Sequence, residues 1–147
     1  MFSLLAILAG PAVQDPAAET KALADCAPTT LEATFVCLDT HWTSRAEYKA
    51  LSYDDTVMAH FGIGMWMRNN WGLWGGGPLA RHFNEMGIEH PDDMSGIILK
   101  SYWLYLHDCP QGVDEQVAFY RDYWDRSEGE DSIPEPILDC TAGASAQ

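Results

Sequence analysis

Positive charge is scarce in this sequence. The chain has 8 Lys and Arg against 22 Asp and Glu, which gives a formal net charge of -14. No cluster of basic residues is present that could follow a phosphate backbone, and an acidic chain is not attracted to anionic lipid surfaces. The composition therefore argues against nucleic acid as a partner.

Long apolar runs are also absent. The strongest run, residues 2–9, is too short to cross a bilayer, so we predict no membrane span. Small residues and Pro11 follow it, a pattern typical of a secretory signal peptide, although no Lys or Arg precedes the run. We assign residues 1–14 to a signal peptide and expect a periplasmic or secreted protein. An internal or mis-assigned start codon is the alternative.

The sequence has no Cys-x-x-Cys spacing, which argues against a redox motif or a zinc knuckle. An even number of cysteines in an exported chain predicts two disulfides, and three pairings are possible. In a cytosolic protein the same residues would be reduced and Cys37 would fill the core. The four candidates are Cys26, Cys37, Cys109 and Cys140.

Strand patterns and internal repeats are missing as well. An apolar content of 47%, with 6 Trp, 6 Tyr and 5 Phe, suffices for one core. We predict an all-α fold, a compact bundle of about five or six short helices with an irregular loop rich in Trp and Gly. The predicted organisation is a linker over 15–28, a helical domain over 29–126, and a loose tail over 127–147 unless Cys140 ties it down.

Start motifs and apolar spacing locate the helices. Thr29 and Glu32 form a capping box for a helix over about 30–41, and Ser44 is positioned to cap a short one. Further helices are predicted over about 53–68, from Pro78 to Gly87, from Pro91 through Tyr105, and over about 113–125.

The helix predicted over about 53–68 leads into the irregular loop over residues 69–77. We expect the rings of Trp71 and Trp74 in this loop to turn inward. One face of the helix is expected to be an apolar stripe that ends in a guanidinium group, formed by Val57, Phe61, Met65 and Arg68.

The central segment resembles a known family. The motif HFGIGMWMRNNWGLW over residues 60–74, then residues 79–83, GIEHPDDMS over 87–95 and IIL over 97–99 are similar to bacterial domains of unknown function 6794. The resemblance runs over about residues 28–120. It implies one domain and brings no established activity, ligand or catalytic residue. The exported-looking start and the four cysteines depart from the family pattern and suggest a version adapted to an oxidising compartment.

Polar and aromatic side chains gather at two helix junctions. If the junctions face each other, they form a polar cluster rimmed by aromatic rings, as in pockets for polar ligands and sugars. The alternative, which we favour, is structural: Arg68 pairs with Asp92 or Asp93, and Asn69 and Asn70 cap helix ends. The candidate ligand-binding residues are Trp66, Arg68, Asn69, Asn70, Trp71, Trp74, His90, Asp92 and Asp93.

A hydrolase is the competing hypothesis. Glu85, Asp92 or Asp93 near His90 could supply the acid and base that cleave cell-wall glycan or peptide. Adjacent acids on one helix point in different directions, however, and the helix dipole already explains them. We therefore assign no catalytic residue.

A metal site built from His60, His82 and His90 with Asp92 lacks a His-x-x-x-His pair. His60 and His82 each lie at the edge of an apolar stripe, where a hydrogen-bonded core histidine is the commoner outcome, so we predict no metal and no cofactor. The sequence favours a non-enzymatic, exported module of the bacterial cell envelope. Its expected partner is an unknown protein or a polar small-molecule or glycan ligand.

Overall fold

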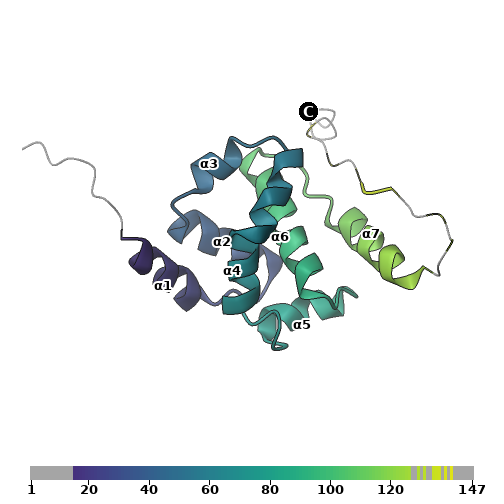
Figure 1. The fold of residues 1–147 in the computed structure, drawn as a ribbon, viewed down its shortest axis with the longest axis horizontal. Coiled ribbons are helices and arrows are strands. Elements are labelled where there is room, and N and C mark those ends of the chain that lie inside the picture. Colours follow the sequence, from purple (N-terminus) through teal and green to yellow (C-terminus); the bar gives the residue numbers. More distant parts are fainter. Residues whose placement is uncertain are drawn as a thin grey trace, which may run out of the picture.

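The structure is a computed structural model that describes residues 15–126 together with 129, 131, 134–136, 138 and 140. The predicted signal peptide over 1–14 lies outside these residues. The described part contains helices and no strand, so the all-α prediction is confirmed, although the helices outnumber the five or six expected (Figure 1). In chain order they are α1 (Pro16–Cys26), α2 (Leu31–His41), α3 (Arg45–Lys49), the 3₁₀ helix η1 (Asp54–Phe61), α4 (Ile63–Asn70), α5 (Pro78–Glu85), α6 (Pro91–Leu106) and α7 (Val113–Asp125).

Most of the segment expected to be a linker is helix α1. Asp15 caps it by accepting a hydrogen bond from the Ala17 amide at 3.0 Å, and Pro16 occupies the first helical turn, where its missing N–H has no cost. Leu23 is buried against the core, and a disulfide joins Cys26 to Cys37 on α2. The linker prediction is wrong because alanine is the best helix former and proline is tolerated in the first turn of a helix, where Pro16 lies.

The cap of α2 lies one residue later than predicted. The Thr30 hydroxyl, and not that of Thr29, accepts from the Ala33 amide at 3.2 Å. The helix bounds themselves agree with the prediction over about 30–41. The short α3 also lies where expected, but Ser44 makes no side-chain cap.

The single helix predicted over about 53–68 is two segments that meet at Gly62. The first is the 3₁₀ helix η1, which has 3.0 residues per turn, so positions four apart do not share a face. The predicted stripe is consequently wrong: Val57, Phe61 and Met65 are 60%, 65% and 46% exposed, whereas Arg68 is buried.

Helix α6 is the centre of the fold. It packs against η1 and against α2, α3, α4, α5 and α7. Helices α4 and η1 lie along one side of it (Figure 1). Fully burying each large apolar side chain contributes about 1.5–3 kcal/mol, so α6 supplies much of the core. Its buried residues include Met94, Ile97, Ile98, Tyr102 and Leu104.

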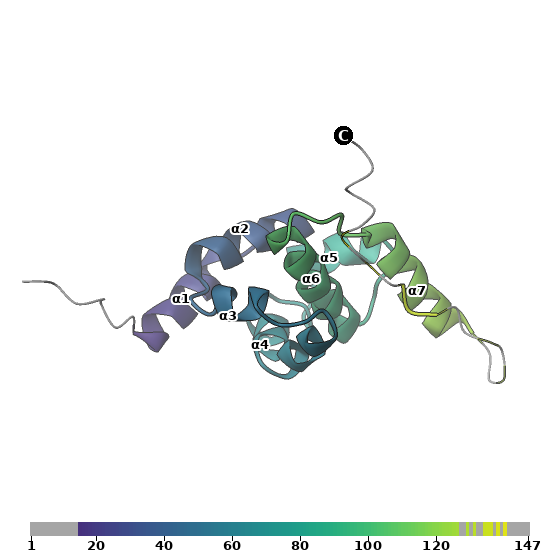
Figure 2. The same ribbon diagram turned by 90° about the horizontal axis from the view of Figure 1, so that it is seen from above.

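Helix α7 lies at the opposite end of the molecule from α1 (Figure 2). Only Gln116 of this helix is buried, and its amide donates to the Ser101 hydroxyl at 3.0 Å and to the Gln111 carbonyl at 2.8 Å. A second disulfide, Cys109–Cys140, closes the segment that carries α7 and ties the described part of the tail to the end of α6. No helix in the described ranges is long and apolar enough to cross a membrane.

Candidate functional site

The two polar junctions predicted from the sequence face each other. Arg68 stands in the last turn of α4 and Asp92 in the first turn of α6, and the Arg68 Nε lies 3.0 Å from the Asp92 Oδ1. The Arg68 side chain is 7% exposed and that of Asp92 is 40% exposed. The pair therefore has one side in the core and one side in solvent.

Further hydrogen bonds satisfy the buried guanidinium. Its Nη1 donates to the Ser95 hydroxyl at 2.8 Å, and its Nη2 donates to the His60 carbonyl at 3.3 Å. Ser95 in turn donates to the Asp92 carbonyl at 3.0 Å. Gly64 leaves room for this arrangement, because a Cβ there would lie 3.1 Å from Leu99 and 3.4 Å from the Arg68 Nη1. A buried charge with this many partners is stable without a ligand.

His60 completes the network from η1. Its Nδ1 lies 3.5 Å from the Arg68 Nη1, and because arginine can only donate, Nδ1 accepts. The proton of the neutral ring is then on Nε2, which lies 3.5 Å from the Asp92 Oδ1. Burial and the adjacent Arg68 charge lower the pKa of His60, and the carboxylates of Asp92 and Asp93 only partly oppose them. His60 is thus neutral at pH 7.

His90, Asp93 and Trp124 link α6 to α7. The Trp124 indole donates to the Asp93 Oδ2 at 2.8 Å, and its ring stacks on His90 with centroids 5.3 Å apart. The His90 Nδ1 accepts from the Asp92 amide at 3.3 Å, which caps α6. Burial raises the pKa of Asp93, while the bond from Trp124 acts in the opposite direction.

The aromatic residues predicted for the site separate into two groups. Trp71 is buried, and its indole donates to the Leu23 carbonyl of α1 at 3.0 Å, with Trp66 packed edge-on against it at 5.7 Å. Trp74 is 59% exposed, contrary to our expectation that its ring turns inward, and its ring centroid lies 6.4 Å from that of His90. Of the three rings, only Trp74 borders the polar cluster in solvent.

The two asparagines do not enter the cluster. Asn70 donates to the Trp66 carbonyl at 2.8 Å, which satisfies a backbone acceptor at the end of α4, as in the structural interpretation. Asn69 is exposed on the same turn.

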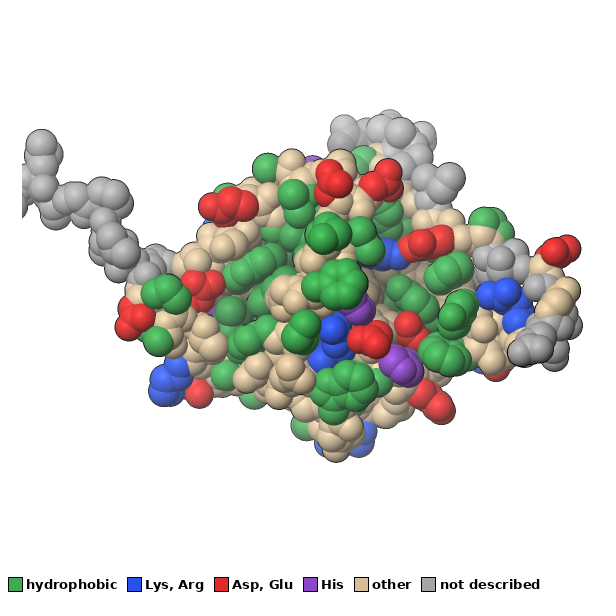
Figure 3. All heavy atoms as spheres, viewed as in Figure 1, with side chains coloured by type: hydrophobic (Ala, Val, Ile, Leu, Met, Phe, Trp, Pro, Cys, Tyr) green, Lys and Arg blue, Asp and Glu red, His purple; other side chains and the backbone are tan. Residues whose placement is uncertain are grey.

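Exposed apolar side chains surround the polar cluster. Figure 3 shows them over η1 and α4, gathered around a small group of basic, acidic and histidine side chains. His60 contacts one of them directly, because its ring packs edge-on against Phe61 at 5.3 Å. We call this set the apolar rim; it consists of Val57, Met58, Phe61, Met65 and Trp74, which are 46–66% exposed.

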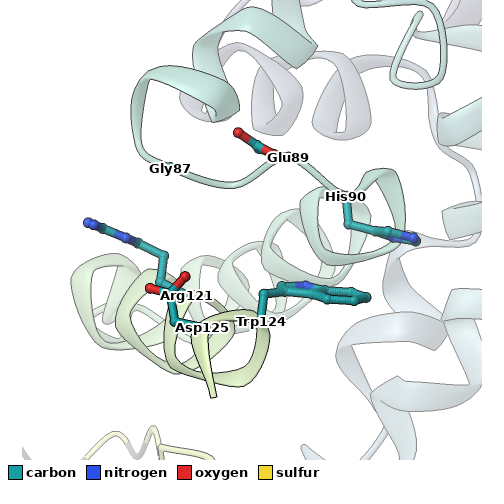
Figure 4. Close-up of a pocket in the computed structure, with 6 residues that line it drawn as sticks. All are labelled: Gly87, Glu89, His90, Arg121, Trp124 and Asp125. Carbon is teal, nitrogen blue, oxygen red and sulfur yellow. The ribbon is translucent and has the colours of Figure 1, made fainter. Parts of the chain in front are cut away.

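Two hollows lie beside the cluster, one on each side of the contact between Trp124 and α6. A hollow of about 470 Å³ is lined by side chains of α7 and of the loop before α6 (Figure 4). The rings of His90 and Trp124 extend side by side along its edge, whereas Arg121 points away from them toward Gly87 (Figure 4). A second hollow of about 240 Å³ lies between η1, α6 and α7 and includes His60, Asp93, Lys100 and Tyr120.

Sequence reasoning missed Ser95, Lys100 and Trp124. Ser95 follows Asp92 by one helical turn, a spacing that places both on one face, so this partner of Arg68 could have been found. Lys100 lies two turns beyond Asp93 on the same face. No local pattern places Trp124 against His90, because that contact depends on how α7 packs.

Two of the candidate acids near His90 are engaged, because Asp92 pairs with Arg68 and Asp93 accepts a hydrogen bond from Trp124. Glu85, the third candidate, is exposed at the end of α5. Within the described residues, no three His, Cys, Asp or Glu side chains are placed to hold a metal ion. His82, considered for such a site, packs beside Phe83 on α5, whereas His60 and His90 both lie near Asp92. The arrangement holds polar groups in place and leaves apolar groups exposed.

Comparison with known proteins gives one match. A family model described as a domain of unknown function, DUF6794, matches residues 27–106, which contain α2 through α6. The match ends before α7, although we expected the resemblance to extend to about residue 120. No curated protein and no solved structure matches the chain. Because the matched region is more than half of the sequence, this chain belongs to the family of domains of unknown function DUF6794.

Proposed function

We propose that this chain is a non-enzymatic binding module, exported to the bacterial cell envelope, that binds a partner protein on its apolar rim. One observation carries the proposal: large apolar side chains are exposed around a charged network that is already satisfied internally. The rim residues Phe61 and Trp74 are 65% and 59% exposed. Contiguous apolar surface with polar groups beside it is typical of protein interaction sites.

The charge of the chain supports one class of partner. Arg68 is neutralised by Asp92, while Asp93 adds negative charge in the hollow that the rim residue Val57 also lines, on a chain with a net charge of -14. A partner with apolar side chains bordered by Lys or Arg would be complementary to this surface.

The disulfides support export. Both pairs, Cys26–Cys37 and Cys109–Cys140, are formed, and such bonds persist in oxidising compartments. The apolar run over residues 2–9 suits a signal peptide. We propose the bacterial cell envelope as the location, and the two disulfides and the apolar run support this proposal.

The alternative, a small hydrolase of cell-wall glycan or peptide, has less support. Its best candidate acid is Asp93, whose pKa is raised by burial. A hydrolase also needs a second, free carboxylate across a ligand-sized gap, whereas Asp92 is held by Arg68. Loss of cell-wall turnover in Asp93→Asn, with the fold retained, would favour this alternative.

Site-specific photo-crosslinking in the expressing host tests the binding proposal. A photoreactive residue at position 61 is compared with one at position 36, because Val36 is equally exposed, at 64%, but lies on α2 outside the rim. We expect one defined crosslinked protein from position 61 and none from position 36. That protein, purified, must then bind the purified chain, and crosslinking without such binding would contradict the proposal.

A further inference from the structure

Lys100 is an isolated basic residue on the central helix. Its side chain is 19% exposed, and its ammonium group pairs with the Glu135 carboxylate and lies 6.0 Å from the centroid of the Tyr120 ring. Burial lowers the pKa of Lys100. A partly buried ammonium group is costly without an anion beside it.

The anion that Lys100 meets comes from an exposed segment. Residues 134–136 have the sequence Pro-Glu-Pro and form no helix, and the Glu135 side chain is 53% exposed. The lysine is therefore the fixed, buried member of the pair and the glutamate is the exposed member. Another anion could therefore replace the Glu135 carboxylate beside Lys100 without disturbing the core.

Space remains on both sides of this pair. The hollow of about 240 Å³ between η1, α6 and α7 and an adjoining one of about 280 Å³ both include Thr56, Val57, Lys100 and Glu135 in their walls. Glu135 thus occupies the position next to the ammonium group without filling the surrounding cavity. A group larger than one side chain has room there.

One tyrosine in the wall of this cavity has a hydroxyl group without a partner. Tyr53 lines the adjoining hollow, and its hydroxyl is buried with no hydrogen-bond partner among the described residues. A buried hydroxyl group without a partner is uncommon in proteins. This observation is independent of the Lys100–Glu135 pair.

We propose that the cavity around Lys100 binds a carboxylate group, and that Glu135 is a built-in occupant which an external carboxylate displaces. The occupant we propose is the glutamate side chain of an acidic peptide in which prolines flank the glutamate, as they do in residues 134–136. Asp54 and Asp93 also line the two hollows, so a single carboxylate is favoured over a phosphate dianion. The charged pair of this site, Lys100 and Glu135, lies outside the apolar rim, although the rim residue Val57 also lines both hollows. Substitutions at Lys100 and Glu135 therefore test this site separately from the proposed partner surface.

Binding in the full-length Glu135→Gln variant tests the site. The probes are the peptide acetyl-Ile-Pro-Glu-Pro-Ile-amide, the same peptide with Gln in place of Glu, sodium acetate and inorganic phosphate. Calorimetry measures affinity, and NMR of the Lys100 side chain reports the contact and the pKa of its ammonium group. Asp131→Asn is the matched control, because it removes an exposed acid from the same segment and leaves Glu135 in place.

We expect Glu135→Gln to bind the Glu peptide at least about tenfold more tightly than the wild type or Asp131→Asn does. The pKa of Lys100 should fall in this variant and rise again when the peptide binds. Adding Lys100→Met should abolish binding. Acetate binding as well as the peptide would indicate a site for any carboxylate, whereas peptide binding alone would indicate a peptide site. Equal affinity for the Glu and Gln peptides, binding unaffected by Lys100→Met, or no binding at all would overturn the proposal.

Discussion

Arg68 and Asp92 join the end of α4 to the start of α6 through a contact of 3.0 Å between Nε and Oδ1. The arginine is almost fully buried beneath η1, and the aspartate is part of the solvent-exposed surface beside the rim. The pair consequently closes the core directly under the proposed binding surface. A substitution at this pair should change the stability of the fold. Its effect on binding therefore has to be distinguished from the effect of a substitution in the apolar rim.

Replacing Arg68 should destabilise the fold. Arg68→Met leaves Asp92, Ser95 and the His60 carbonyl without their donor, so we expect a loss of about 2–4 kcal/mol in the free energy of unfolding. Arg68→Lys should lose less, because it keeps the charge but cannot form the forked set of hydrogen bonds. Chemical denaturation followed by circular dichroism measures both. Arg81→Met is the control: Arg81 is exposed and, among the described residues, its side chain donates to the Gly76 carbonyl. A loss as large as that of Arg68→Met would refute the role of the network.

Acid should weaken the same junction through His60. The pKa of His60 in the folded chain is lowered below its ordinary value of 6.5, so the fold favours the neutral ring. The stability from this residue is present above pH 6.5 and is lost as the pH falls through the lower, folded-state pKa. His60→Gln, which cannot be protonated, should flatten the pH dependence of stability in this range. An unchanged profile in thermal melts between pH 5 and about 7 would show that another group controls it.

The sequence predicted those elements whose signals are local. Pro91 followed by two acids marks the start of α6, and the observed helix begins there. The break at Gly62 was not predicted, because the acids and apolar spacing before it also suit an α-helix, and only packing against α4 and α6 selects the 3₁₀ form. Val57 and Phe61 are exposed because residues four apart do not share a face in the 3₁₀ helix.

The candidate site could be predicted in part for the same reason. Arg68 and Asp92 were named as partners because charged groups at helix ends tend to pair. For His60 the sequence favours a hydrogen-bonded core histidine over a metal ligand. Its contact with Arg68 was not predicted, because the position of His60 relative to Arg68 depends on the turn at Gly62. The inward orientation predicted for Trp74 failed, whereas Trp71 is buried because α1, taken for a linker, supplies an acceptor at Leu23.

The disulfide that closes the longer loop should contribute slightly more stability, because the entropy of loop closure grows with the logarithm of loop length. Cysteines 31 positions apart, Cys109 and Cys140, close a longer loop than Cys26 and Cys37, which are 11 apart. Chain entropy predicts losses of about 4 and about 3 kcal/mol when each pair is replaced by Ala. Denaturation of the two double variants measures the losses.

Limited proteolysis locates the effects of these variants. Without Cys26–Cys37, cleavage should begin in α1, because this bond ties α1 to α2. Without Cys109–Cys140, cleavage should begin beyond α6, because this bond closes the segment that carries α7. Cleavage within α6 in either variant would contradict this assignment.

Trp124 should control the attachment of α7. Trp124→Phe keeps a ring beside His90 but removes the hydrogen bond to Asp93, so we expect a loss of about 0.5–1 kcal/mol and faster amide hydrogen exchange in the last turns of α7. Tyr123→Phe is the control, because Tyr123 is similarly exposed, at 53%, on the same helix. Exchange that is equal in the two variants would show that the bond to Asp93 does not hold the helix.

The most direct test of the proposed binding module is the affinity of the crosslinked, purified partner for Phe61→Ser compared with Val36→Ser. Both changes replace an exposed apolar side chain, so each should alter the free energy of unfolding by no more than about 0.5 kcal/mol. If the apolar rim is the binding surface, Phe61→Ser weakens binding by at least about tenfold and Val36→Ser leaves it unchanged. Equal affinity of the two variants for the partner would contradict the proposal.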